Sequence, residues 1–173
     1  MPNWVVNEMT LYGDKETIKK LMEKCRSVDE YGEVNVFDFN GIVPTPSNIY
    51  QGDLGSKEEK LYGKNTWYDW NCDNWGTKWN SVDASFYESC DGLYHVTFNT
   101  AWSAPIPIFD AIHKQYPNLR IVVNFADEDL GNNCGIYDNG NIVWDEDMED
   151  PFAFACDMWG YDVEEMKEEY GIA

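Results

Sequence analysis

The chain has 173 residues, enough for one domain with a sizeable buried core. Its 32 acidic residues outnumber 12 basic ones, which gives a formal net charge of −20 at pH 7. A charge of this sign argues against partners held mainly through phosphates, such as nucleic acids and anionic membranes. No apolar run approaches the roughly 20 residues that span a bilayer, and no signal peptide opens the chain. We therefore expect a soluble, cytoplasmic protein without a membrane partner.

The aromatic and cysteine contents indicate a folded protein whose cysteines are reduced. Phe, Trp and Tyr make up 16% of the residues, whereas disordered acidic chains are poor in aromatics. The five cysteines are odd in number and widely spaced, which is unlike a secreted disulfide framework. Reduced structural thiols are the better interpretation.

The chain opens with a predicted strand and helix. Apolar residues alternate over residues 3–11, the period of a half-buried strand. Asp14 is a suitable cap for a helix reaching about residue 26, whose apolar side chains recur at helical spacing. A second strand is predicted over residues 33–40. Residues 47–81 are polar and rich in Trp, and we interpret them as an insertion without assigned secondary structure.

A hairpin, a helix and a strand follow the insertion. Residues 85–87 and 93–100 predict the two hairpin strands, turning at Asp91-Gly92. Pro105 suits the first turn of a helix that ends near residue 116. Residues 119–125 form the clearest strand in the chain.

The sequence pattern in the last third of the chain predicts a second hairpin and two helices. The strands cover residues 132–137 and 142–144, and the Asn139-Gly140 pair between them is typical of a type I′ turn. Helices are expected near residues 151–158 and 163–170. The second has a cap, a capping-box partner and a terminator at Asp162, Glu165 and Gly171.

This order of elements contains the split βαβ-βαβ pattern, so we predict an α+β, ferredoxin-like antiparallel sheet. The expected domain covers residues 1–140, including the insertion. Residues 141–173 are expected to be an acidic hairpin and helical extension packed on the same domain. Residues 127–173 hold 15 acids and one base, Lys167, interleaved with apolar anchors. We infer that this acidic segment docks its apolar side and displays its carboxylates outward.

Several short sequence segments (phrases) in the first 140 residues together resemble the YubB-type family of plasmid and phage proteins. They are Met1-Pro2-Asn3-Trp4 with Asn7, Phe37-Asp38-Phe39-Asn40, Ile42-Val43-Pro44-Thr45-Pro46, Asn74-Trp75-Gly76-Thr77-Lys78-Trp79-Asn80 and Phe98-Asn99-Thr100-Ala101-Trp102-Ser103-Ala104-Pro105. The resemblance implies a ferredoxin-like domain and a mobile-element origin, and we expect the protein in the cytoplasm of a bacterial host. The resemblance implies no activity. The segment after about residue 141 lies outside these phrases.

Two groups of residues are candidate partner-binding sites. The aromatic candidate is the insertion, where indoles lie beside amides and could stack a base or sugar, or anchor a protein contact. Its residues are Trp67, Trp70, Trp75, Lys78 and Trp79. The simpler alternative is that these rings pack the insertion over the open face of the sheet, with Lys78 paired to Asp73 or Asp83.

The acidic candidate, called the acidic face below, gathers carboxylates of the last third of the chain. Its residues are Asp127, Glu128, Asp129, Asp145, Glu146, Asp147, Glu149, Asp150, Glu164, Glu165, Glu168 and Glu169. They could solvate the protein, or they could imitate the phosphate array of a nucleic acid, about one charge per 1.7 Å of duplex axis.

The sequence gives little support for a catalytic site, a metal site or a cofactor site. There are two histidines and no short Cys-x-x-Cys or His-x-x-x-His pairing, and the acidic triplets lack EF-hand spacing. No phosphate-binding loop, nucleophile elbow or dinucleotide fingerprint is present. We expect a protein that is not an enzyme and has no catalytic residues, metal or cofactor.

The favoured hypothesis is a nucleic-acid mimic that binds and inhibits a basic host protein, such as a defence nuclease or a CRISPR effector. A protein-binding scaffold or phage assembly module, with acids that only solvate it, is the alternative. Direct binding of single-stranded nucleic acid is the least favoured function, because basic residues are scarce.

Overall fold

Strand β1 (Trp4–Tyr12) lies inside a six-stranded sheet and pairs antiparallel with β5 on one side and β6 on the other. The computed structural model describes residues 3–90 and 92–172. The strand order is β4-β5-β1-β6-β7-β8, and every neighbouring pair is antiparallel. The other strands of this sheet are β4 (Val82–Glu88), β5 (Tyr94–Ala101), β6 (Arg120–Asp127), β7 (Gly135–Asp138) and β8 (Asn141–Trp144).

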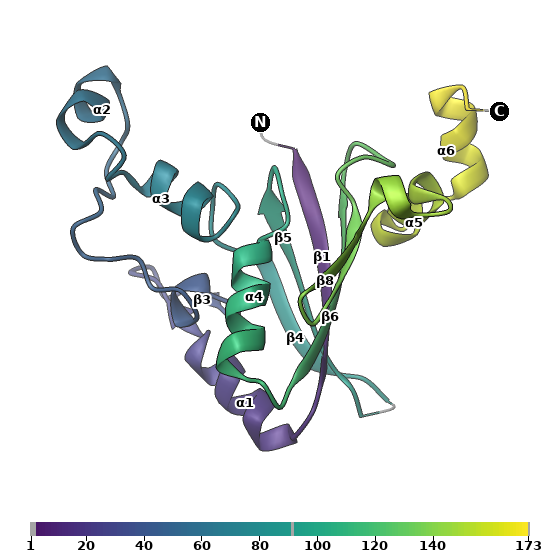
Figure 1. Ribbon diagram of the computed structural model, residues 1–173, viewed down its shortest axis with the longest axis horizontal. Coiled ribbons are helices and arrows are strands. Elements are labelled where there is room, and N and C mark those ends of the chain that lie inside the picture. Colours follow the sequence, from purple (N-terminus) through teal and green to yellow (C-terminus); the bar gives the residue numbers. More distant parts are fainter. Residues whose placement is uncertain (1–2, 91, 173) are drawn as a thin grey trace.

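Helices α1 (Lys15–Lys24) and α4 (Ile106–Gln115) cover one face of this sheet (Figure 1). Asp14 caps α1 by accepting a hydrogen bond from the Thr17 amide, as its sequence predicts. The main core lies between the helices and the sheet. Among its fully buried side chains are Met9, Leu11, Ile18, Leu21, Val96, Phe98, Ile108, Phe109, Ile112, Val123 and Phe125.

The predicted ferredoxin-like fold is confirmed by this topology. β1, β4, β5 and β6 are the four core strands, and α1 and α4 are the two crossover helices. The β7–β8 hairpin extends the sheet beyond β6. Its turn has positive φ at both Asn139 (49°) and Gly140 (94°), which confirms the type I′ geometry.

The strand predicted over residues 33–40 is wrong. The chain there forms only a short ribbon of β2 (Ser27–Val28) and β3 (Val34–Asn35), followed by the 3-10 turn η1 (Phe39–Gly41). Side chains interrupt the strand, because Asn35 Oδ1 accepts from the Phe37 amide and Asp38 Oδ1 accepts from the Asn40 amide. The second strand of the ferredoxin-like core is therefore β4.

The insertion over residues 47–81 contains two helices that its sequence does not predict. They are α2 (Ser56–Tyr62) and α3 (Trp67–Asn74), and Thr66 caps α3 by accepting from the Asp69 amide. α3 lies near α4, whereas α2 stands away from the body of the protein (Figure 1). Trp75 packs in the main core, so the insertion covers the helix-bearing face of the sheet rather than its open face.

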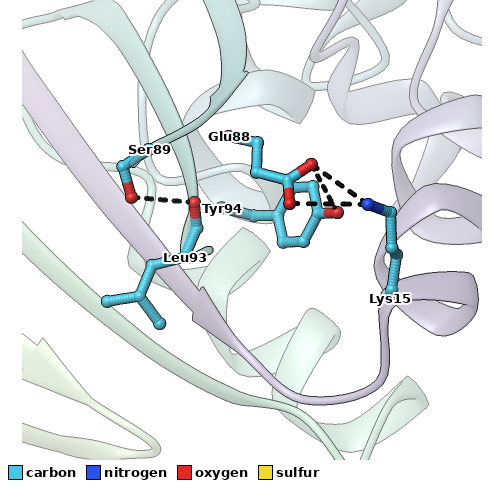
Figure 2. A network of polar contacts seen from close by, with 5 residues as sticks. All are labelled: Lys15, Glu88, Ser89, Leu93 and Tyr94. Atoms are coloured by element: carbon cyan, nitrogen blue, oxygen red, sulfur yellow. Dashed lines mark hydrogen bonds and ion pairs between the residues drawn. The ribbon is translucent and has the colours of Figure 1, made fainter. Parts of the chain in front are cut away.

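The β4–β5 hairpin is tied to the start of α1. Glu88 lies at the end of β4, and its carboxylate accepts from Lys15 Nζ at 3.1 Å and from the Tyr94 hydroxyl at 2.9 Å (Figure 2). The Tyr94 hydrogen bond, followed by the Lys15 contact, lowers the pKa of Glu88. The predicted turn at Asp91-Gly92 includes residue 91, and the first quoted phrase includes residues 1 and 2; these three lie outside the described residues.

The acidic segment folds onto the opposite face of the sheet. It contains the 3-10 turn η2 (Asp145–Asp147) and helices α5 (Pro151–Trp159) and α6 (Val163–Tyr170). Its own small core is centred on Ala126, Phe152 and Ala155, with Val6 of β1 packed against it. The described part of the chain has no helix with the length and apolar character to cross a membrane.

Phe37 tests the revised position of residues 33–40. Its side chain is fully buried and packs against Phe98 at a ring distance of 4.9 Å, although it belongs to no strand of the main sheet. We expect Phe37→Ala to lower the free energy of unfolding by about 3–5 kcal/mol in urea titrations. Tyr31→Ala, at an 84% exposed position of the same connection, should change it by less than about 0.5 kcal/mol. Equal effects of the two substitutions would contradict this packing.

Candidate functional site

The residues of the acidic face do not all lie on the surface. Asp127 is 5% exposed and accepts hydrogen bonds from Asn3 Nδ2 at 3.2 Å, Asn133 Nδ2 at 2.7 Å and the Asp129 amide at 2.9 Å. Asp145 is half-buried and accepts from the Asn133 amide at 3.1 Å. These two carboxylates hold the loop after β6 in place, and burial leaves Asp127 little surface for a partner.

The other ten residues of the acidic face are exposed. They are Glu128, Asp129, Glu146, Asp147, Glu149, Asp150, Glu164, Glu165, Glu168 and Glu169. Asp150 also caps α5, because its carboxylate accepts from the Ala153 amide at 2.9 Å. These side chains come from the loop after β6, from η2 with the loop after it, and from α6.

Four of the exposed carboxylates share one side of α6. Glu164, Glu165, Glu168 and Glu169 follow the i, i+1, i+4, i+5 spacing that groups side chains on one face of a helix. The other face of α6 packs through Val163 and Met166 onto the small core, and the Tyr170 ring lies 5.6 Å from Phe152. Lys167 contacts Glu164 at 3.7 Å, a pair with little weight at this exposure.

The aromatic candidate residues do not form one surface. Trp75 is 4% exposed, donates its indole N–H to the Val43 carbonyl at 2.9 Å and packs edge-on against Phe39. The Trp70 ring lies 5.3 Å from Trp75 and is half-buried. This pair anchors the insertion on the core, so only Trp67, Lys78 and Trp79 remain as contact candidates.

Lys78 lies between two indole rings. Its ammonium is 4.7 Å from the Trp79 ring centroid and 4.6 Å from that of Trp102, within the range of cation–π attraction. Within residues 3–90 and 92–172, Lys78 forms no ion pair. The expected pairing with Asp73 or Asp83 is therefore wrong, because the rings hold the ammonium instead.

Trp102 is a feature that the sequence does not reveal. Its φ of 76° lies in the left-handed region, which a bulky side chain rarely adopts, and the residue is 41% exposed. Backbone contacts fix this conformation: the Trp102 amide donates to the Asn3 carbonyl, and its carbonyl accepts from Asn133 Nδ2. Only the backbone geometry distinguishes Trp102, because its sequence neighbours are of the same kinds as those of the other tryptophans.

An open pocket of about 580 Å³ lies between the chain after η1 and helix α3. Indoles and uncharged polar side chains make up most of its lining, and the described lining contains no charged residue. The lining residues are Asn40, Thr45, Pro46, Ser47, Ile49, Gln51, Trp67, Asn71, Trp75, Trp79 and Asn80.

Asp38 organises the amide side of this pocket. Its Oδ1 accepts from Asn80 Nδ2 at 2.7 Å and from Asn40 Nδ2 at 3.0 Å. Asn80 Oδ1 in turn accepts from the Phe39 amide at 2.9 Å. Burial raises the pKa of Asp38, but hydrogen bonds from Asn80, Ser27 and Asn40 outweigh it, so this pKa lies below its usual range.

The open face of the central sheet carries paired polar side chains. Thr10 Oγ1 lies 3.2 Å from His95 Nδ1, and the Ser85 and Thr97 hydroxyls are 2.7 Å apart. Tyr87 stacks on His95 with a ring distance of 5.2 Å. An RNA-binding sheet of this topology stacks bases on several aromatics and neutralises phosphates, whereas here the Tyr87 ring is already stacked on His95.

Two of the buried thiols are poorly suited to react as nucleophiles. All five cysteines are free, and burial raises the pKa of Cys25 to about 12 and that of Cys134 to about 11, which disfavours the thiolate. In the described part of the chain, no group of three or more His, Cys, Asp or Glu side chains has a geometry that could hold a metal ion.

Substitutions at Trp102 test its strained backbone. A left-handed conformation costs an ordinary L-residue about 1–2 kcal/mol, a cost that glycine avoids. Both Trp102→Gly and Trp102→Ala remove the ring, so their difference isolates the backbone. We expect the glycine variant to have a free energy of unfolding about 1 kcal/mol higher than the alanine variant in urea titrations. A more stable alanine variant would place Trp102 in an ordinary conformation.

Asp38 gives a pH-dependent test of the amide network. Its lowered pKa means that it contributes stability above the pKa of an unfolded aspartate, about 3.9, and that this contribution is lost as the pH falls toward the folded-state pKa. We expect Asp38→Asn to lower the free energy of unfolding by about 1–3 kcal/mol at pH 7. The gap between the two proteins should narrow from pH 5 to pH 3. Asp73→Asn is the control for losing one negative charge; a gap that stays constant with pH would contradict the network.

Comparison with known proteins gives one match. The family model described as the ferredoxin-like domain in Api92-like protein matches residues 74–173. No curated protein and no solved structure matches the chain. The match takes in β4 to β6 and also the acidic segment, which lies outside the phrases that resemble the YubB-type family. Since it covers more than half of the residues, the chain belongs to the family of ferredoxin-like domains in Api92-like proteins.

Proposed function

We propose that this protein acts by stoichiometric binding, presenting its exposed carboxylates to a basic nucleic-acid-binding protein. The observation that carries the proposal is the outward face of α6, where four glutamates stand together on a helix whose other side is packed. The protein would occupy the partner's nucleic-acid site and inhibit it. This function requires no catalytic residue.

Order is what distinguishes these carboxylates from a solvated acidic tail. The helix pair is held by the packing of Phe152, Ala155 and Cys156, and Trp159 donates its indole N–H to the Asp127 carbonyl at 3.0 Å. A fixed array can match fixed cations on a partner, and it does so at a lower entropic cost than a mobile tail. Because residues 127–173 contain one base, few internal cations compete for the array.

The partner class follows from the charge and from the resemblance to the YubB-type family. Long-range attraction speeds the encounter with a cationic groove, and like charge repels nucleic acids and other acidic proteins. A mobile-element origin would make a bacterial defence nuclease or CRISPR effector the useful target. The protein would then act in the host cytoplasm.

Helix α2 favours a second candidate function, a protein-binding scaffold. No residue of α2 is buried, Leu61 is 70% exposed, and the helix stands away from the rest of the protein (Figure 1). An exposed apolar side chain on a projecting helix suits a protein contact. In this alternative, the acidic residues keep the assembly soluble.

Neutralisation of α6 separates the two functions. We expect the quadruple variant Glu164→Gln, Glu165→Gln, Glu168→Gln and Glu169→Gln to bind its partner at least about tenfold more weakly at low salt. The partner is first isolated from bacterial lysate with the wild-type protein, and affinity is then measured by calorimetry. Bound partner should be displaced by added DNA and by high salt.

A control variant carries the same change of charge on the other side of the molecule. It replaces four exposed glutamates of α1 and the β2–β3 region, namely Glu16, Glu23, Glu30 and Glu33, with Gln. If the two variants weaken partner binding equally, the contribution of α6 is only that of net charge. Binding that ignores α6, salt and DNA would favour the scaffold function, which Leu61→Ser should then weaken.

A further inference from the structure

We propose that the pocket between the chain after η1 and helix α3 binds a neutral saccharide, either free or as a unit of a glycan. This site is separate from the acidic face and independent of the function proposed for it. Its volume of about 580 Å³ lies within the range of small-molecule sites, about 300–1,000 Å³.

The lining combines apolar rings with uncharged polar groups. Trp67 and Trp79 supply indole surface, and Asn40, Asn71, Asn80, Gln51, Ser47 and Thr45 supply amides and hydroxyls. Amides offer both donors and acceptors, as do the hydroxyls of a sugar. The C–H face of a sugar ring is apolar and suits an indole. A chain with a net charge of −20 that places no charged side chain in this lining favours an uncharged ligand.

The site is organised before any ligand arrives. The Trp67 indole N–H donates to the Gly52 carbonyl at 3.1 Å and that of Trp75 to the Val43 carbonyl at 2.9 Å, so two of the rings are fixed. Asp38 orients the amides of Asn40 and Asn80 through the hydrogen bonds described above. Fixed rings and amides lower the entropic cost of binding a polar ligand.

Asn71 and Trp79 of the lining each carry a polar group without a hydrogen-bond partner among the described residues. Asn71 is 7% exposed, and its Nδ2 donates to the Lys78 carbonyl at 2.9 Å, whereas its Oδ1 accepts no hydrogen bond from the described residues. The Trp79 indole N–H likewise has no acceptor among them. An acceptor on Asn71 and a donor on Trp79, both residues of the lining, match the dual character of a hydroxyl group.

A nucleotide fits this site less well than a saccharide. The cation nearest in sequence to Trp79 is Lys78, and its ammonium is engaged over the rings of Trp79 and Trp102. A phosphate would therefore meet a strongly acidic protein without a free cation in the lining. A nucleoside, which lacks the phosphate, is the informative competitor in the test.

The pocket is probed with a panel of neutral methyl glycosides and disaccharides of glucose, galactose, mannose and N-acetylglucosamine, each at 5 mM. Saturation-transfer NMR detects binding to the full-length protein, and calorimetry measures the affinity of each hit. We expect at least one saccharide to bind. A variant with Trp67→Ala and Gln51→Ala should weaken that binding by at least about tenfold.

Trp144→Ala is the matched control, because it removes a 36% exposed tryptophan on β8, outside the pocket. It should leave saccharide affinity unchanged, and circular dichroism checks that both variants fold. Absence of binding across the panel would overturn the proposal. So would binding of adenosine, cytidine, guanosine or uridine alone, or saccharide binding that survives the pocket substitutions. Each of these results leaves the role of α6 unaffected, since its test uses a protein partner.

Discussion

The long connection between α1 and β4 is held to the molecule by one aromatic cluster, and most of what is distinctive about this protein depends on it. Phe37 and Phe39 contact Phe98 of β5, and Trp75 contacts Phe39 edge-on. More than fifty residues separate α1 from β4, and without buried anchors they would gain little to offset the entropy of ordering them. With these anchors, the insertion packs beside α4 in a fixed position and can form one side of a pocket.

The same sheet supports two surfaces of different electrostatic character, one uncharged and one acidic. The helix-bearing face carries the insertion, with a pocket lined by uncharged side chains. The other face carries α5 and α6, which expose carboxylates. β1 contributes to both, because its alternating side chains place Met9 in the main core and Val6 under the acidic segment. A ligand or partner at one surface need not touch the other, so the two proposed roles are physically separable.

Local sequence patterns predict the elements correctly where the spacing of apolar residues matches the face that is buried in the structure. The alternation in β1, the helical stripe of α1, the Asn139-Gly140 turn and the Asp162 cap of α6 all appear as expected. The strand predicted at residues 33–40 fails because Asn35 and Asp38 satisfy nearby amides, which competes with strand pairing. The candidate site is less predictable, because burial differs between neighbouring residues of the same charge. Asp127 is enclosed while Glu128 is exposed, and only tertiary contacts decide this.

The distribution of charge also carries an energetic argument. The described residues contain three ion pairs, all between partly exposed groups, so paired charges contribute little to holding this fold. Like charges on α6 repel one another, and the repulsion is opposed by the packing of Val163, Met166 and Tyr170 and by the cap at Asp162. The acidic segment is therefore ordered in spite of its charge. A cationic partner would relieve this repulsion on binding, whereas solubility alone would be served equally well by dispersed charge.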